Sequence, residues 1–436
     1  MFELKKNNKI FIGFGEITGY YQLLAKGFKE KGFDVTLVHE NVSLYCPSYF
    51  TTKNDNFLVS TVLFARKKYF YSNNLLSKSF WFLLTEMGKF LMMFWAIYKF
   101  DVFIFGFGKS FILGNYDLQI LKFFKKVIIS NIGAGSESRP PYIDGSYYSN
   151  DGKLKNFFLI KFLTKLKRKK VQRVEKFSSK VISNPNVCHF NNKQFINWLS
   201  LGIPTPTDRL STVVKREKNK PIKILHAPSI RHVKGSSIIK KAINNLKEKG
   251  YDILYIKINQ LSHSRVLEEL KKCDLVIDQC FSDYQMPGFA TEAASMGKPV
   301  IIGGYQLDYF KRFYIDEPPP TFTCKPNEIE FAIEQLINND DKRVETAKDL
   351  KKYVINYFSY LDITESYIRI INNKIPKTWY IDPKNIFYTY GWGVEKENLK
   401  KSLKKLLNKY GPNIFELSHN KKLEQFFIDF IKNKKI

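Results

Sequence analysis

The sequence has few cysteines, and none of them form a closely spaced pair. Five cysteines are scattered over 436 residues, and no C-x-x-C motif occurs. A disulfide scaffold needs more cysteines in a shorter chain, and a structural zinc site needs closer spacing. We therefore predict reduced thiols at core or surface positions of a cytoplasmic protein.

Long uncharged hydrophobic runs are also scarce. The first apolar run, residues 10–12, is soon broken by glycine and is too short for a signal peptide. The most apolar stretch, residues 80–100, contains Glu86 and Lys89 near its middle, whereas a membrane-spanning helix needs about 20 nearly uncharged residues. We therefore expect this stretch to lie at most against a bilayer. No internal repeat of solenoid length is present.

Acidic residues are few relative to basic ones. The chain has 41 Asp and Glu against 70 Lys and Arg, which gives a net charge of +29. This excess predicts an anionic partner, whether nucleic acid, membrane phospholipid or a phosphorylated substrate, and it does not bear on the fold. The hydrophobic share of 44% and the charged share of 25% are average for globular proteins, so a folded chain is expected.

The N-terminal half alternates strand and helix patterns. Apolar runs at 9–14 and 34–38 flank a helical pattern that Gly32 ends. Further helices are expected at 80–99, 118–124 and 160–177, and further strands at 101–105, 127–130 and 181–183. Strands separated by helices predict a parallel sheet with helices on both faces.

A second series of the same kind follows a linker. Residues 202–221 are rich in Pro, Ser, Thr and Lys, which is typical of a linker. Strands are then expected at 222–226, 252–258, 274–278 and 299–302, and helices at 236–249, 264–272, 290–296, 327–357 and 362–373. The prediction is an α/β protein with domains at 1–205 and 221–375 and a helical extension at 376–436. Ligands are expected at the carboxyl ends of the strands and in the cleft between the lobes.

The first motif whose side chains could bind a ligand or take part in a reaction is H-A-P-S-I-R-H-V-K-G at residues 226–235. A strand leads into a loop with Arg231 and Lys234, and a helix begins directly after it. Helix N-termini present free N–H groups and partial positive charge, and two added cations favour a phosphate ligand. The alternative is that both cations are simply solvated in a surface loop. His226 and His232 lie nearby and are more often structural than catalytic.

The second motif follows the strand at 274–278. A loop with M-P-G leads into a helix of small residues that carries Glu292. One carboxylate can accept two hydrogen bonds from the vicinal hydroxyls of a ribose. The alternative is a helix-capping glutamate beside closely packed alanines.

Together the two motifs carry a family resemblance over residues 222–303. The order H-A-P-S-x-R-x-x-K-G, D-x-x-I-D-Q and E-A-x-x-x-G-K-P-V-I resembles the donor-binding half of retaining glycosyltransferases of family 4. The resemblance implies a GT-B fold, with two doubly wound Rossmann-like lobes, an interdomain cleft and a C-terminal helical extension. It implies that Arg231 and Lys234 neutralise the donor diphosphate and that Glu292 holds the ribose. The further donor-binding candidates are Ser229, Gly235, Tyr284 and Gly288.

The sequence departs from the family pattern at two places. The family often has a second glutamate eight residues before the ribose-binding one, and that position here is Tyr284, between Asp283 and Gln285. The strand that ends at residues 105–108 lacks the histidine found in many relatives. The departures leave the donor sugar open.

The acceptor is expected on the N-terminal lobe, across the cleft. Loops of small residues allow a ligand to approach closely, and two such loops follow predicted strands. The acceptor-side candidates are Gly13, Gly15, Glu16 and Glu137. Both carboxylates have the alternative interpretation of solvated or loop-stabilising groups.

The basic helix at 160–177 and the aromatic-rich helix at 80–100 suit an anionic membrane surface. The competing explanation is AT-rich codon usage, since Asn and Ile are also frequent. With the membrane interpretation, we expect a peripheral protein at the inner face of the cell membrane.

The predicted function is transfer of a sugar from a nucleotide-diphosphate donor to a glycan or lipid-linked acceptor, in surface polysaccharide or glycoconjugate synthesis. The resemblance implies retention without a protein nucleophile. No D-x-D motif occurs in a plausible loop, which favours chemistry without a metal, and no cofactor is expected. Two alternatives stay open: a non-catalytic partner subunit of the same fold, and a basic nucleic-acid-binding protein. Against the latter, no RNA-recognition or helix-turn-helix signature is present.

Overall fold

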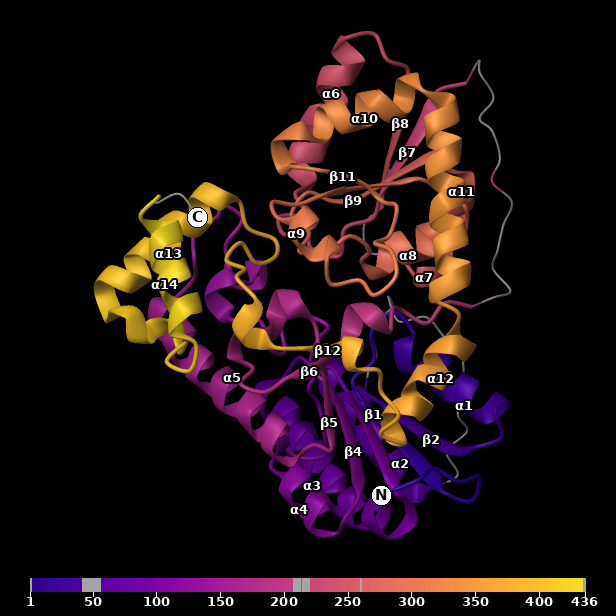
Figure 1. Ribbon diagram of the computed structural model, residues 1–436, viewed down its shortest axis with the longest axis vertical. Coiled ribbons are helices and arrows are strands. Elements are labelled where there is room, and N and C mark those ends of the chain that lie inside the picture. The colour runs from indigo at the N-terminus through magenta and orange to yellow at the C-terminus, as the bar shows by residue number, and fades with distance from the viewer. Residues whose placement is uncertain (1, 41–55, 207–212, 214–219, 259–260, 434–436) are drawn as a thin grey trace.

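The computed structural model describes residues 2–40, 56–206, 213, 220–258 and 261–433, and they form two lobes around two sheets (Figure 1). The first sheet has the strand order β12-β6-β5-β4-β3-β1-β2, and the second has the order β11-β10-β9-β7-β8. All strand pairs are parallel except β12 with β6. The predicted α/β architecture with two doubly wound lobes is confirmed.

The first lobe follows the predicted alternation closely. Its elements are β1 (Lys9–Phe14), α1 (Tyr20–Glu30), β2 (Asp34–His39), α2 (Phe57–Tyr71), α3 (Leu75–Lys99), β3 (Val102–Gly106), α4 (Asp117–Phe123), β4 (Val127–Asn131), α5 (Phe157–Phe177), β5 (Lys180–Ser183) and β6 (Phe195–Asn197). Helix α2 and strand β6 were not expected from the sequence. The whole of β3 is buried, as it must be where helices cover both faces of a parallel sheet.

The second lobe contains the strands and helices expected between residues 222 and 357, and also a helix at 307–311 and a strand at 322–324 that were not expected. Its elements are β7 (Ile222–His226), α6 (Ser236–Glu248), β8 (Ile253–Lys257), α7 (His263–Lys272), β9 (Leu275–Gln279), α8 (Gly288–Ser295), β10 (Val300–Gly303), α9 (Leu307–Lys311), β11 (Phe322–Cys324), α10 (Ile329–Asn338) and α11 (Asp340–Tyr357). One core cluster contains side chains from both lobes, so the lobes share packing at their junction.

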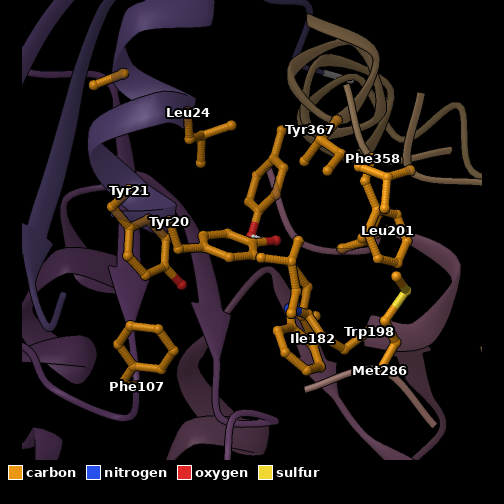
Figure 2. Close-up of a cluster of buried hydrophobic side chains, with 14 of the residues drawn as sticks. Tyr20, Tyr21, Leu24, Phe107, Ile182, Trp198, Leu201, Met286, Phe358 and Tyr367 are labelled. Atoms are coloured by element: carbon orange, nitrogen blue, oxygen red, sulfur yellow. Dashed lines mark hydrogen bonds between the residues drawn. The ribbon is translucent and has the colours of Figure 1, made fainter. Parts of the chain in front are cut away.

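After α11 the chain returns to the first lobe. Helix α12 (Tyr360–Ile371) packs on α1, and β12 (Tyr380–Ile381) pairs antiparallel with β6. Figure 2 shows the contact between α1 and α12, where the hydroxyl oxygens of Tyr20 and Tyr367 lie 3.3 Å apart. The expected boundary at residue 375 stays a prediction, and in the structure α12 lies with the first lobe.

The C-terminal extension packs on the first lobe. Helices α13 (Lys396–Tyr410) and α14 (Lys421–Ile431) lie within the helical extension that was expected at 376–436. The ring of Tyr142 lies 5.3 Å from that of Phe415 and 5.6 Å from that of Phe427, measured between centroids. Figure 1 shows these helices (yellow) at the side of the molecule.

Two expectations fall partly on residues outside the described ranges. The predicted linker at 202–221 is described only at residues 202–206, 213, 220 and 221. Four cysteines are free thiols (Cys188, Cys273, Cys280 and Cys324), and Cys46 lies outside the described residues.

We predict that Gly27→Ala destabilises the protein by about 1–3 kcal/mol, because a Cβ at this position would lie 2.1 Å from Oγ1 of Thr364 on α12. Glycine to alanine inside a helix without such a contact is stabilising. Urea unfolding of Gly27→Ala, Thr364→Ala and the double variant measures the coupling. The double variant should be less destabilised than the sum of the single changes. Additive effects would show that α12 does not restrict α1 here.

Candidate functional site

A cavity of about 560 Å³ lies between the two lobes. This volume is within the range of small-molecule sites, which are commonly about 300–1,000 Å³. The first lobe contributes two loops, at residues 17–18 and 134–139. The second lobe contributes the loops that follow β7, β8 and β9, together with one side of α8. Trp392, from the segment before α13, completes the lining.

Lys234 lies where the loop after β7 meets α6. Its Nζ is 3.2 Å from Oδ1 of Asp278, whose side chain is almost completely buried on β9. Gly235 has a φ of 71° and begins the turn into α6; a Cβ there would lie 2.6 Å from Cβ of Cys280. The glycine therefore lets α6 start close to the end of β9, and this places Lys234 at the cavity.

His226 holds the loop between β7 and α6 in place through two hydrogen bonds. Its Nδ1 donates to the carbonyl of Ile277 at 2.8 Å, and its Nε2 accepts from the Ser236 hydroxyl at 2.8 Å. Burial lowers the pKa of His226 to about 4, so the ring is neutral near pH 7 and suited to this donor–acceptor pair. His226 does not line the cavity and has a structural role; His232 does not line it either.

Glu292 projects into the cavity from α8. Its Oε1 lies 2.6 Å from Nε2 of His263, the first residue of α7, and both side chains line the cavity. Sequence reasoning did not find His263, because its partner lies 29 residues away. Gly288 begins α8 and faces the other lobe: a Cβ there would lie 3.1 Å from Cγ2 of Thr18.

A buried ion pair joins the lobes at the cavity wall. Arg139, from the loop after β4, pairs with Asp283, from the loop after β9, and both side chains are buried. The guanidinium also lies 5.4 Å from the ring centroid of Trp392, whose Nε1 donates to Oε1 of Gln279 at 3.2 Å. Neither the pair nor Trp392 was predicted as part of the site, since only tertiary structure brings them together.

The expected donor-side residues separate into two groups. Lys234, Ser229, Tyr284, Gly288 and Glu292 all line the cavity. Tyr284 also packs edge-on against Trp198 of the first lobe, with 6.0 Å between ring centroids. Gly235 positions the loop without lining the cavity.

Arg231 does not line the cavity. Its side chain is exposed, and desolvation together with the charge of Arg231 lowers the pKa of Lys257 at the end of β8. The expectation that Arg231 lies at the donor diphosphate beside Lys234 therefore does not match its position. The loop turns outward at residues 230–231 and returns at Lys234, and spacing along the sequence does not reveal that turn.

Of the expected acceptor-side residues, only Glu137 lines the cavity. Its Oε1 accepts from the backbone N–H of Ala134 at 2.6 Å and of Gly135 at 3.0 Å. Burial raises the pKa of Glu137, and the two N–H groups oppose that shift. Lys167 on α5 supports the loop by donating to the carbonyl of Arg139 at 3.0 Å.

Gly13, Gly15 and Glu16 lie behind the cavity. A Cβ at Gly15 would lie 2.5 Å from the carbonyl oxygen of Gly106 at the end of β3. A glycine is therefore needed here because the chain after β1 packs closely against β3, and not because a ligand approaches. Glu16 is buried at the start of α1, where its Oε2 accepts from the N–H of Gln22 at 2.9 Å. These three expected acceptor-side residues are thus outside the cavity lining.

No family model matches the sequence, and no match is found among curated proteins. Among solved structures, the catalytic domain of starch synthase IV from Arabidopsis thaliana, bound to ADP and acarbose, has a TM-score of 0.50 at 12% identity. The likeness covers 84% of this chain and 99% of that one. The chain has the GT-B fold.

Two further solved structures give similar superpositions. Sucrose-phosphate synthase from Thermosynechococcus elongatus has a TM-score of 0.49 at 11% identity, covering 84% of this chain and 99% of that one. HepE from Anabaena, in complex with UDP-glucose, has a TM-score of 0.48 at 11% identity, covering 84% and 100%. At these identities the comparisons describe the GT-B fold and not the reaction of this chain.

Within the described part of this GT-B chain, no three His, Cys, Asp or Glu side chains gather as a metal ion would require. The cavity side chains instead form charge pairs, Lys234 with Asp278 and Arg139 with Asp283. Chemistry without a metal stays a prediction.

We predict that Asp283→Ala lowers the free energy of unfolding by about 3–5 kcal/mol, because it leaves the Arg139 guanidinium buried without its carboxylate. The double variant Arg139→Met with Asp283→Leu should recover most of that loss, since no charge is then buried. Urea denaturation of both variants measures the difference. Equal destabilisation of the single and double variants would show that charge pairing is not what the position requires.

A second prediction concerns Glu16, whose pKa burial raises from 4.5 to about 8. As the pH rises from 4.5 to 8, the unfolded chain loses this proton while the folded chain keeps it, so the free energy of unfolding falls. Glu16→Gln removes this contribution. The variant should therefore gain stability relative to wild type as the pH rises toward 8, as measured by denaturation at several pH values. A constant difference across that range would contradict the burial effect.

Proposed function

We propose that the protein is a glycosyltransferase that moves a sugar from a nucleotide-diphosphate donor to an acceptor hydroxyl. One observation carries the proposal. Lys234 and Glu292 come from two separate strand–loop–helix units, and they line one cavity with a loop of the opposite lobe. The GT-B fold, whose solved members noted above include structures with ADP and with UDP-glucose, is consistent with this function.

The donor is proposed to lie along the second lobe. Lys234, in the loop before α6, would hold the diphosphate. Glu292 would accept hydrogen bonds from the ribose hydroxyls. Ile258, Leu261 and Val266 line the cavity near His263 and offer an apolar surface to the base.

The reaction breaks the bond between the anomeric carbon and the diphosphate oxygen, and the electron pair goes to the leaving diphosphate. The acceptor oxygen bonds to the anomeric carbon, and its proton passes to the diphosphate or to solvent. Lys234 would stabilise the charge that grows on the diphosphate, which is binding that strengthens in the transition state. The family resemblance supports retention of configuration without a protein nucleophile or a metal.

The acceptor is proposed to enter from the first lobe, beside Glu137. Burial raises the pKa of this carboxyl, whose Oε1 accepts from the backbone N–H groups of Ala134 and Gly135. Gly13, Gly15 and Glu16 have no part in this proposal because they lie outside the cavity lining. The acceptor class is a glycan or a lipid-linked glycan, as in surface polysaccharide or glycoconjugate synthesis.

We predict that at least one of UDP-, GDP-, ADP- or CMP-linked sugars raises the melting temperature of the protein. A ligand at 100 times its dissociation constant stabilises by about 2.7 kcal/mol. Glu292→Ala should abolish this shift. Lys234→Ala should abolish it too, but it leaves the buried Asp278 without its partner, so Lys234→Ala with Asp278→Asn is the better variant.

Lys240→Ala, an exposed lysine on the same helix α6, is the matched control and should keep the full shift. Arg231→Ala tests the charged donor-side residue that lies outside the cavity lining. A shift that persists in both site variants would contradict the proposed donor site. No nucleotide effect, together with co-purification of another enzyme, would favour a non-catalytic subunit. Salt-sensitive DNA binding without a nucleotide effect would favour a nucleic-acid-binding protein.

A further inference from the structure

Helix α3 turns an apolar stripe toward solvent. Side chains at spacings of three and four residues are exposed by 50% to 94% along its length (Leu76, Phe80, Leu83, Met87, Leu91, Phe94 and Tyr98). This spacing forms one continuous helix face. A helix on the surface of a globular protein normally turns its apolar face inward, whereas α3 also has an apolar face that is turned outward.

The inward side of α3 includes two polar side chains. Lys89 is buried, with its Nζ 3.1 Å from Oε1 of Glu40 and 3.3 Å from Oε1 of Glu86. Thr85 is buried too, and its hydroxyl donates to the carbonyl of Trp81 at 2.7 Å. Glu86 and Lys89 therefore have charged partners within the protein, and the exposed stripe does not result from a missing inward face.

Contacts on the buried side of α3 hold its apolar stripe facing outward. Met92, Met93 and Ala96 belong to the core beneath the first sheet. Gly88 lets α2 come close, since a Cβ there would lie 2.6 Å from Cγ2 of Val62. By length and composition α3 could span a membrane, with a mean hydropathy of 1.3 over its most apolar 18 residues, but 33% of that window is buried in the protein. A helix that is packed on one side in this way presents its other side as a surface.

Positive charge surrounds the apolar surface. Residues 57–99 contain six basic residues and one acidic residue. On α5, which covers the same face of the sheet, two stripes of exposed side chains run side by side at four-residue spacing. One stripe is apolar (Phe158, Phe162 and Leu166), and the other is basic (Lys161, Lys165 and Lys169).

We propose that the outward faces of α3 and α5 form a docking surface for an anionic lipid membrane. Phe, Leu and Met side chains of α3 would enter the interfacial region, and lysines of α5 would contact acidic headgroups. Charge complementarity selects this occupant over a second copy of the chain, because two chains of net charge +29 would bring their basic stripes together. The surface holds the protein at the inner face of the cell membrane. It does not depend on the proposed transfer reaction.

Flotation of the full chain with vesicles tests this surface. The probes are vesicles of phosphatidylglycerol and phosphatidylcholine in equal parts, and vesicles of phosphatidylcholine alone. We expect binding to the anionic vesicles, weakened but not abolished by 0.5 M salt, because salt screens the headgroup contacts and leaves the apolar ones.

The apolar stripe is tested by Phe80→Ser with Met87→Ser and Phe94→Ser. Affinity for anionic vesicles should fall about tenfold or more. The matched control replaces exposed apolar residues of the second lobe, Leu254→Ser with Phe331→Ser, and should bind as wild type does.

A variant with fewer changes tests whether misfolding explains the loss of vesicle binding. Leu76→Ser with Tyr98→Ser changes the two most exposed residues of the stripe, at 80% and 94%, and should keep the wild-type melting temperature while weakening vesicle binding.

The basic stripe is tested by neutralising the three lysines of α5 to Gln. Affinity should fall about tenfold, and the salt dependence of binding should weaken. The control neutralises three exposed lysines of α6 (Lys240, Lys241 and Lys247), which changes the net charge equally. Equal loss in both variants would mean that overall charge, and not this surface, drives binding.

Three further outcomes would overturn the proposal. The first is wild-type protein that does not float with anionic vesicles, and the second is stripe variants that float as wild type does. The third is lipid-free protein that dimerises through α3, so that the serine variants become monomers. Nucleotide-induced thermal shifts, measured on the same variants without lipid, report separately on the donor site. A failed membrane test with a normal nucleotide shift would therefore leave the proposed function standing.

Discussion

The parallel pairing of the strands is the constraint on which the site depends. Every strand of a parallel sheet ends at the same edge, so the loops that follow the strands gather there. The loop after β4 supplies residues 134–139 of the cavity, and the loops after β7 and β9 supply Lys234 and residues 283–287. The Arg139–Asp283 pair then joins the loop edges of the two lobes through one buried contact. Without the common edge, these charged groups would lie on unrelated surfaces.

Local sequence pattern was sufficient for the second lobe. The motifs at 226–235 and 286–301 each consist of a strand, a loop and a helix start, and such a unit places its own residues within a few turns of chain. Lys234, Gly288 and Glu292 accordingly line the cavity. The same reasoning failed for Arg231, because one outward turn of a loop is decided by packing around it. It failed for Gly15 because the close neighbour that requires a glycine is Gly106 of the protein.

What the sequence did not predict depends on contacts between distant segments. His263 meets Glu292 across two elements, and Arg139 meets Asp283 over 144 residues. Trp392 reaches the cavity only because the chain returns to the first lobe after α11. Helix α2 has little amphipathic pattern to reveal it, with just Val59, Val62 and Ala65 buried. None of these contacts leaves a periodic or spaced signal along the chain.

The charge pairs of the cavity also bear on which ligands could bind there in the proposed reaction. Lys234 already has Asp278, and Glu292 already has His263. A ligand gains from Lys234 only if it offers more negative charge than one carboxylate, as a diphosphate does. It gains from Glu292 only if it offers donors that replace the imidazole, as a ribose diol does. A ligand with only one of these groups would replace Asp278 at Lys234 or His263 at Glu292, and it would form no favourable contact with the other pair. The paired state therefore favours a ligand that carries both groups at a fixed separation, as a nucleotide diphosphate does.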